Sequence, residues 1–293
     1  MRLQRTIKRE ATFRGIGLHT GKYASVKLKP APRDTGIVFY RSDKGAIIKA
    51  NIASVIDTAF ATTIGFEGAK IRTVEHLLAA ASGLGIDNLL IEVDGPEIPI
   101  LDGSAVGLAG VLLEAGIAKQ GKKVSVIRIT NPVVYEDSHS RVVALPYDGM
   151  RISYYINFSH HLLGHQELTL DIDEESFERD IAPARTFGFL RDEKMLRANG
   201  LAKGASLDNA VVVGDDGVLN ASGLRFADEF VRHKILDTIG DLSLIGFPIH
   251  GHIMLEKAGH TANLNFLKKL LHSADCYSLL SEVDHLSRHV LNY

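Results

Sequence analysis

The sequence predicts an α+β protein with two domains of similar architecture. Its 293 residues are enough for two domains of ordinary size, each with a substantial core. In each half of the chain, segments with strand character come first, and helical patterns and a further strand follow them. The polar residues 121–123 indicate a boundary between the halves near residues 119–125. We therefore expect domains at 1–122 and 123–280, followed by a C-terminal tail at 281–293.

The composition is that of a soluble globular protein, with 45% hydrophobic and 23% charged residues. A net charge of −2 gives no general attraction to nucleic acid or to an anionic membrane. The polar, basic segment 1–10 lacks the apolar core of a signal peptide, and no apolar run reaches the roughly 18 residues of a membrane helix. We expect a cytoplasmic monomer with no transmembrane segment and no nucleic-acid partner.

The first half begins with strand patterns. Strands are expected at 3–13, 23–28, 36–41 and 46–52, which together indicate an antiparallel sheet. The glycine-rich stretch 15–21 lies between the first two strands. A nucleotide-binding GxGxxG fingerprint opens a helix, whereas this stretch leads into a strand, so we interpret it as a hairpin loop.

The first helical pattern covers residues 73–83. Thr73 suits the N-cap, and Gly83 suits the position after the C-terminus. Glu75 and His76 then lie in the first turn, where the helix dipole favours anions and disfavours imidazolium. We expect His76 to be neutral, the form that binds metals. The first half ends with a strand at 87–93 and a helix at 105–115.

The second half has the same order of elements. Strands are expected at 124–129, 133–135, 141–145, 151–156 and 168–172. Helices are expected at 174–180, 192–199 and 226–244, then a strand at 252–255 and a helix at 261–271. No residue-level repeat accompanies this order, so the similarity of the halves is one of architecture.

The pattern at 226–244 carries three polar residues on one helical face. His233, Asp237 and Asp241 follow one another at intervals of four, which aligns them at about 3.6 residues per turn. An imidazole and a carboxylate one turn apart can bind one cation. A surface His–Asp pair has the same spacing, so this pattern alone leaves both interpretations open.

Any metal site must use His, Asp or Glu, because the single cysteine, Cys276, cannot form a cysteine-based cage or an intrachain disulfide. A hydrolytic zinc site has three protein ligands and an open position for water. His76 is the strongest candidate to join His233 and Asp237. The adjacent Glu75 points about 100° away on the helix, so it could miss the metal yet reach its water as a general base. Alternatively, this carboxylate only complements the helix dipole.

Two other groups of histidines are alternatives. His160, His161 and His165 contain an i, i+4 pair but lie in a loop-like region with no rigid element to hold ligands. His250 and His252 could face one way on a strand. The HExxH motif of the commonest zinc proteases is absent from the sequence.

Seven short segments carry a more specific resemblance. They read GIGLHTG at 15–21, TVEHL at 73–77, GIDN at 85–88, PEIPILDGS at 96–104, ARTFGF at 184–189, FVRHKILD at 230–237 and GH at 259–260. In this colinear order, from about residue 3 to about residue 275, the chain resembles one family. It is the zinc-dependent UDP-3-O-acyl-N-acetylglucosamine deacetylase family of lipid A biosynthesis.

The resemblance implies roles for particular residues. It implies Zn²⁺ bound by His76, His233 and Asp237. Glu75 would then be the general base and His260 the general acid, with Asp241 as the orienting partner of His260 rather than a ligand. Thr186 would donate a hydroxyl hydrogen bond to the oxyanion, and Phe187 would contact the substrate through its apolar ring.

The resemblance also implies further substrate contacts. Lys234 would supply positive charge, both in the catalytic site and near the anionic part of the nucleotide sugar. A passage for the fatty acyl chain is expected at Leu190, Ala202, Ser206, Ala210 and Val212, although such residues equally suit a packed core. Glu193 near this passage and His161 after His160 depart from the family pattern, which affects the acyl preference rather than the reaction.

For the whole chain, the resemblance implies helices layered against a sheet in each domain, with the active site at the domain junction. The expected reaction is zinc-dependent hydrolysis of the N-acetyl group of UDP-3-O-(3-hydroxyacyl)-N-acetylglucosamine to the free amine and acetate, the committed step of lipid A biosynthesis. A non-catalytic nucleotide-sugar-binding protein and an amidohydrolase of different substrate range are the alternatives. Zinc-dependent acetate release and a panel of N-acetyl sugars distinguish them.

Overall fold

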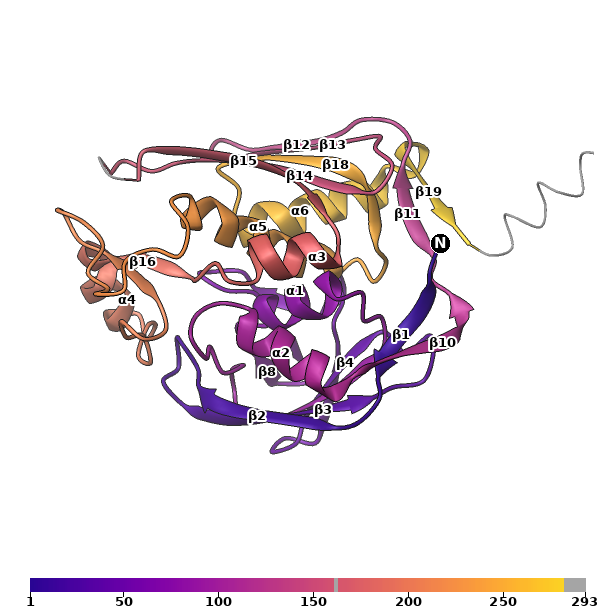
Figure 1. The fold of residues 1–293 in the computed structure, drawn as a ribbon, viewed down its shortest axis with the longest axis horizontal. Coiled ribbons are helices and arrows are strands. Elements are labelled where there is room, and N and C mark those ends of the chain that lie inside the picture. Colours follow the sequence, from indigo (N-terminus) through magenta and orange to yellow (C-terminus); the bar gives the residue numbers. More distant parts are fainter. Residues whose placement is uncertain (161–162, 282–293) are drawn as a thin grey trace, which may run out of the picture.

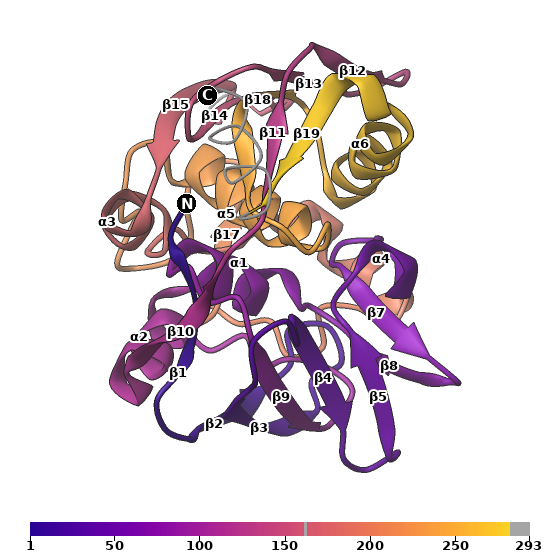
Figure 2. The same cartoon turned by 90° about the vertical axis from the view of Figure 1, so that its right-hand side faces the viewer.

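The computed structural model describes residues 1–160 and 163–281 of the chain. His161 and the predicted C-terminal tail, apart from Ser281, lie outside the described residues. Figures 1 and 2 show two β-sheets with helices between them, which confirms the predicted α+β class and its packing of helices against sheets. Within the described residues, no helix combines the length and the apolar character needed to span a bilayer.

The sheet of the first half has five strands in the order β2-β3-β9-β4-β5. These are β2 (Ala11–Ile16), β3 (Tyr23–Pro30), β9 (Leu89–Asp94), β4 (Ile37–Arg41) and β5 (Ala46–Lys49). β4 runs parallel to β9, and the other neighbours are antiparallel. Alternate residues such as Val26, Leu28 and Phe39 are buried, which is the pattern of a sheet with one face on a core. The helices α1 (Glu75–Gly83) and α2 (Val106–Ala115) cover that face (Figure 1).

The sheet of the second half has seven strands and is organised around β18 (Ile249–Glu256). β18 pairs in antiparallel fashion with β13 and in parallel fashion with β11 and β14. The other strands are β11 (Val126–Ile129), β12 (Val133–Glu136), β13 (Arg141–Leu145), β14 (Met150–Asn157), β15 (His165–Ile172) and β19 (Tyr277–Leu280). The helices α5 (Glu229–Ser243) and α6 (His260–His272) pack side by side on this sheet, and α5 lies between the sheet and α1 (Figure 2).

The two halves meet where α1 packs against α5, at the centre of the molecule (Figure 2). Gly240 of α5 makes this close approach possible, because a Cβ at that position would overlap the carbonyl oxygen of Glu75. The apolar residues of α5, including Ile235, Leu236 and Ile239, are buried in the same core. The first turn of α1 therefore lies directly against the polar face of α5.

The remaining elements are short. β1 (Leu3–Ile7) pairs with β10 (Ile117–Lys123), and β16 (Phe187–Phe189) pairs with β17 (Val211–Val213). A three-stranded sheet contains β6 (Val55–Asp57), β7 (Thr63–Phe66) and β8 (Ala69–Ile71). The short helical segments are 3-10 turns at Ile52–Ser54, Leu190–Asp192 and Ala274–Cys276, α3 (Glu174–Ser176), a π-helical turn at Phe177–Ile181, and α4 (Glu193–Ala198).

Several sequence-based boundaries differ from the structure. The strand expected at 3–13 is two strands, β1 and β2, and the helix expected at 174–180 is one α-helical turn followed by a π-helical turn. The strands β6, β7, β8, β10, β16, β17 and β19 were not predicted. Most of these have only three or four residues, too few to establish an alternating pattern.

Both predicted caps of α1 are wrong. Thr73 has a φ of +58°, and its hydroxyl donates to Oε1 of the buried Glu97 at 2.8 Å. The helix therefore begins at Glu75, two residues after Thr73. Gly83 is the last helical residue, and the left-handed conformation falls on Gly85, with a φ of +65°. Gly83 has no side chain because the ring of Phe177 occupies the space that a Cβ would need.

Candidate metal centre and active site

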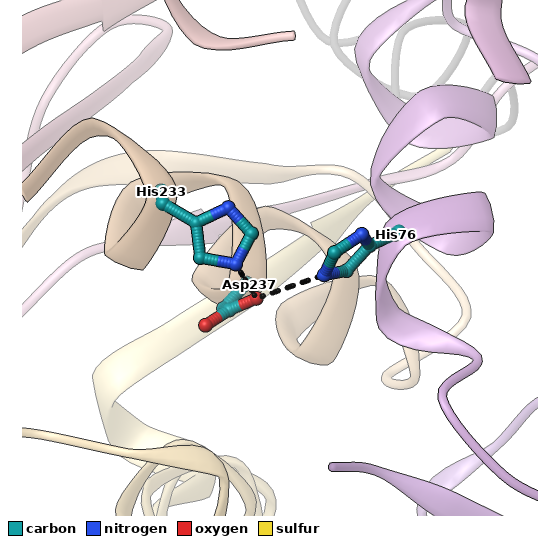
Figure 3. A group of neighbouring side chains, drawn as sticks. All are labelled: His76, His233 and Asp237. Carbon is teal, nitrogen blue, oxygen red and sulfur yellow. Dashed lines mark ion pairs between the residues drawn. The ribbon is translucent and has the colours of Figure 1, made fainter. Parts of the chain in front are cut away.

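Three side chains from the two central helices converge on one point (Figure 3). His76 projects from the first turn of α1, and His233 and Asp237 project from successive turns of α5. Asp237 Oδ1 lies 3.6 Å from Nε2 of His76 and 3.3 Å from Nε2 of His233. All three residues are buried, and their potential ligand atoms lie within 4.8 Å of one another.

This spacing fits a zinc ion. Ligand atoms about 2.0–2.1 Å from a tetrahedral zinc are separated by about 3.3 Å, close to the two distances at Asp237 Oδ1. His233 is oriented by its second nitrogen, because Nδ1 donates to the carbonyl oxygen of Ala184 at 3.0 Å and leaves Nε2 free for a metal. His76 Nδ1 is buried and has no hydrogen-bond partner among the described residues.

The protonation states also suit a metal. Burial and the neighbouring His233 lower the pKa of His76 to about 3, and burial lowers the pKa of His233 itself. Burial opposes ionisation of Asp237, but its cationic surroundings, above all the Lys234 ammonium, outweigh burial, so the pKa of this carboxyl falls below its usual range. His76 is neutral as predicted, although burial rather than the helix dipole is the main cause. Two neutral imidazoles and a carboxylate are a ligand set that catalytic zinc uses.

Glu75 lies beside the cluster and takes no part in it. Its Oε2 accepts a hydrogen bond from the backbone N–H of Thr62 at 3.0 Å, and its Oε1 lies 3.9 Å from Nε2 of His260. Burial raises the pKa of Glu75 to about 8, with His260 opposing that shift. A divalent cation in the adjacent cluster would favour the carboxylate form.

His260, the first residue of α6, is paired with Asp241 of α5. Its Nδ1 lies 2.8 Å from Oδ2 of Asp241. Burial alone would lower the pKa of His260, but the charge and hydrogen bond of Asp241 raise it to about 9. The imidazole is therefore protonated at neutral pH, and its Nε2 lies 3.9 Å from Oε1 of Glu75. Asp241, the last of the three polar residues aligned on α5, contacts His260 and does not belong to the candidate metal cluster.

A cavity of about 870 Å³ opens over these groups. It is lined by Glu75, His76, Thr186, Phe187, His233, Lys234, Asp237 and His260, together with loop residues that include His19, Phe60, His139 and Phe158. Lys234 Nζ donates to Asp237 Oδ2 at 2.8 Å. The Phe187 ring packs edge-on against Phe230, with the ring centroids 4.9 Å apart.

The segment that carries Ala184 and Thr186 is held by a buried ion pair. The Arg185 guanidinium donates to Glu229 through Nε at 2.8 Å, and its backbone N–H donates to the same carboxylate oxygen at 3.0 Å. The Thr186 backbone N–H donates to the Gly103 carbonyl oxygen at 2.8 Å. This segment therefore bridges the start of α5 and the first half of the chain.

The residues expected to form the acyl passage lie elsewhere. None of Leu190, Ala202, Ser206, Ala210 and Val212 is among the residues that line the 870 Å³ cavity. Leu190 directly follows β16, Ala210 directly precedes β17, and Val212 lies within β17. Leu190 and Ser206 are exposed, whereas Ala202 and Ala210 are buried. Their role stays a prediction.

The alternative histidine groups do not form metal clusters in the described residues. His252 Nε2 lies 2.8 Å from the Ser153 hydroxyl, and His160 Nε2 lies 3.0 Å from the Gly214 carbonyl oxygen. His165 lies 3.9 Å from the Glu167 carboxylate on an exposed strand edge. His161 lies outside the described residues.

Two residues that bind the Asp241 carboxylate were not anticipated from the sequence. Asn263 donates from Nδ2 to Asp241 Oδ2 at 2.9 Å, and the Thr62 hydroxyl donates to Asp241 Oδ1 at 2.6 Å. The position of Asn263 three residues after His260 on a helix could have indicated the first contact. Nothing in the sequence around Thr62 indicates the second.

The chain is similar to known proteins of one family. The family model described as UDP-3-O-acyl N-acetylglycosamine deacetylase matches residues 4–272. A relative from Thermodesulfovibrio yellowstonii, named UDP-3-O-acyl-N-acetylglucosamine deacetylase, is 57% identical over 96% of this chain and 96% of its own length. Relatives of the same name from Syntrophotalea carbinolica and Oleidesulfovibrio alaskensis are 47% and 49% identical over 94% of this chain and 90% of their own length. These matches confirm the resemblance seen in the sequence, and the chain belongs to the UDP-3-O-acyl-N-acetylglucosamine deacetylase family.

Proposed function

We propose that this protein catalyses the zinc-dependent hydrolysis of the N-acetyl group of UDP-3-O-(3-hydroxyacyl)-N-acetylglucosamine to the free amine and acetate, the committed step of lipid A biosynthesis. The names of the relatives supply the substrate class. The observation that carries the proposal is the convergence of the His76, His233 and Asp237 cluster with Glu75 and His260 in one cavity.

His76, His233 and Asp237 would hold the zinc ion. When bound there, zinc would polarise the acetamide carbonyl and lower the pKa of a water molecule. The Lys234 ammonium donates a hydrogen bond to the second oxygen of the Asp237 carboxylate. Burial lowers the pKa of Lys234, but the negative charge of Asp237 outweighs burial and raises that pKa above its usual value. Lys234 thus orients a ligand, and its position in the cavity wall lets its charge also act on the anionic part of the substrate.

Glu75 would act as the general base. The Thr62 backbone N–H holds Oε2 of Glu75, so Oε1 is the oxygen on the side of His260 and available to accept a proton. This oxygen would take a proton from the attacking water as the water oxygen bonds to the acetamide carbon. A positioned general base contributes about 10²–10⁴-fold to such a step.

His260 would act as the general acid. Its Nδ1–H is bonded to Asp241, so the proton available for transfer is the one on Nε2. The amine that leaves when the C–N bond breaks would receive this proton. Asp241 stabilises the imidazolium and fixes its orientation, as the carboxylate of a catalytic triad does.

The remaining residues of the site would contact the substrate. The Thr186 hydroxyl would donate to the tetrahedral oxyanion, a contact whose loss typically costs about 3 kcal/mol in barrier. The Phe187 ring would pack against an apolar part of the substrate. The fatty acyl chain would pass along the region of Leu190, Ala202, Ser206, Ala210 and Val212.

The organisation of the protein is also part of the proposal. The chain would divide into domains at 1–122 and 123–280, with the catalytic cavity at their junction. We also propose that the protein is a cytoplasmic monomer, as the sequence analysis expects. Sedimentation of the purified protein tests the oligomeric state.

Acetate release from the purified protein tests the function. Acetate should appear with the UDP-linked acylated substrate, cease after chelation and return when zinc is added back. A protein that binds the substrate but releases no acetate at any zinc concentration would be a binding protein, and the proposal would be wrong. Equal turnover of simple N-acetyl sugars would instead indicate an amidohydrolase of broader range.

A further inference from the structure

Thr62 contacts both members of the proposed proton-transfer pair, although it is uncharged. Its backbone N–H donates to Oε2 of Glu75 at 3.0 Å. Its hydroxyl donates to Oδ1 of Asp241 at 2.6 Å, and Asp241 in turn is bonded to His260. Only 1% of Thr62 is exposed, so water cannot replace either contact without a rearrangement of the core.

The hydroxyl bond sets the orientation of the Asp241 carboxylate. Oδ2 accepts from Nδ1 of His260 at 2.8 Å and from Nδ2 of Asn263 at 2.9 Å, both on α6. The Thr62 hydroxyl binds the opposite oxygen, Oδ1, from the first half of the chain. The terminal torsion of an aspartate is soft, so hydrogen bonds on both oxygens determine its plane. A short hydrogen bond from a hydroxyl to a carboxylate is among the stronger ones in proteins.

The backbone of Thr62 is itself fixed. Its carbonyl oxygen accepts from the Val74 N–H at 3.2 Å, one residue before α1 begins, and the neighbouring Ala61 is fully buried. Thr62 lies between β6 and β7, outside the central helices. This one residue therefore connects α1, α5 and, through Asp241, α6.

We propose that Thr62 is a positioning residue for the reaction. Its hydroxyl holds Asp241 in the orientation that directs the Nε2–H of His260 toward the departing amine, and its backbone N–H holds Glu75. This inference rests on the proposed deacetylase function. It assigns to the β6–β7 connection a part in proton transfer that neither the sequence pattern nor the family match indicates.

Thr63 provides a matched control. It is the next residue, it is 3% exposed, and its hydroxyl is buried without a hydrogen-bond partner among the described residues. Replacement of either threonine by valine keeps the size and the branched shape of the side chain and removes only the hydroxyl. The two variants differ in whether that hydroxyl binds a catalytic carboxylate.

The first experiment compares Thr62→Val, Thr62→Ser and Thr63→Val in the zinc-loaded protein. Loss of an outer hydrogen bond that orients a catalytic group typically lowers activity about 10–100-fold, so Thr62→Val should lower kcat by about that factor with KM nearly unchanged. Thr62→Ser keeps the hydroxyl and should restore kcat to within about threefold of the wild type. Thr63→Val should keep the wild-type kcat. Zinc content should be the same in all variants, and each variant should keep a cooperative melting transition.

A double-mutant cycle separates positioning from general support of the fold. If Thr62 acts through Asp241 and His260, then Thr62→Val should have little further effect on kcat in a His260→Ala background. A residue that only stabilises the fold would lower kcat by the same factor in both backgrounds. Should Thr62→Val lose its melting transition, Thr62→Ala takes its place in the cycle.

The wild-type measurement distinguishes the two proposals. No acetate release by the wild type would refute the deacetylase function itself. With an active wild type, a folded, zinc-containing Thr62→Val protein with unchanged kcat would overturn the role of Thr62. A Thr62→Ser protein as impaired as Thr62→Val, or an equal loss in the His260→Ala background, would overturn it as well.

Discussion

His260 Nδ1 lies 2.8 Å from Asp241 Oδ2, and this contact joins the first residue of α6 to the last turn of α5. Both side chains are nearly inaccessible to solvent, with 10% and 2% of their surface exposed. An ion pair in such surroundings needs further hydrogen bonds to be stable. Thr62 and Asn263 supply them to the carboxylate. The pair therefore keeps an imidazolium inside a buried cavity.

The first prediction concerns pH. Asp241 raises the pKa of His260 to about 9, and a general acid works only in its protonated form. The value of kcat/KM should therefore fall as the pH rises through about 9. Asp241→Asn removes the charge that raises this pKa, so the decline should move to lower pH. His260→Ala should abolish the decline and retain zinc, and an unchanged profile in that variant would exclude His260 as the acid.

The second prediction concerns Glu75. Glu75→Gln keeps an oxygen that can accept the Thr62 N–H but cannot take a proton from water. Steady-state kinetics should show kcat lowered by about 10²–10⁴-fold. The zinc content should equal that of the wild type, because Glu75 is not in the ligand cluster. Activity close to the wild type would show that another group is the base.

The third prediction concerns the contact between the halves. Gly240→Ala places a methyl group where the Glu75 carbonyl oxygen lies, so the free energy of unfolding should fall by about 1–3 kcal/mol in urea titrations. Gly110 lies within α2 with open space around it, so Gly110→Ala is the control and should raise that free energy by about 0.5–1 kcal/mol. Equal stabilities of the two variants would contradict the close packing of α1 on α5.

The fourth prediction concerns the buried ion pair between Arg185 and Glu229, which holds the segment that carries Thr186. Glu229→Gln leaves the Arg185 guanidinium buried without a carboxylate, and the exposed fractions of the two side chains are only 0% and 7%. Unfolding titrations should show a loss of about 3–5 kcal/mol. Glu193→Gln breaks the exposed pair with Arg197 and should cost at most about 0.5 kcal/mol. Similar costs for the two variants would mean that Arg185 is hydrated or paired elsewhere.

The alignment of the polar residues on α5 could be predicted from the sequence because all three lie on a single helix. The helical period alone places His233, Asp237 and Asp241 on one face. The assignment of Asp241 to His260 came from the family resemblance, since a period does not say which elements face a helix. The structure supplies that relationship through the packing of α6 beside α5.

Other features could not be predicted because tertiary contacts override local preference. Thr73 is a favourable N-cap, yet the buried Glu97 carboxylate takes its hydroxyl and the helix begins at Glu75. Gly83 resembles a helix stop, yet it is glycine because Phe177 packs against it. No sequence pattern around Thr62 indicates its contacts, because they form only where α1, α5 and α6 pack together.

The most direct test of the account is the zinc position in crystals of the wild-type protein, measured by anomalous scattering at the zinc absorption edge. We expect one strong peak per chain, about 2.0–2.2 Å from a nitrogen of His76, a nitrogen of His233 and an oxygen of Asp237. A peak that lacks any of these three contacts, or no peak from a protein that releases acetate, would contradict it.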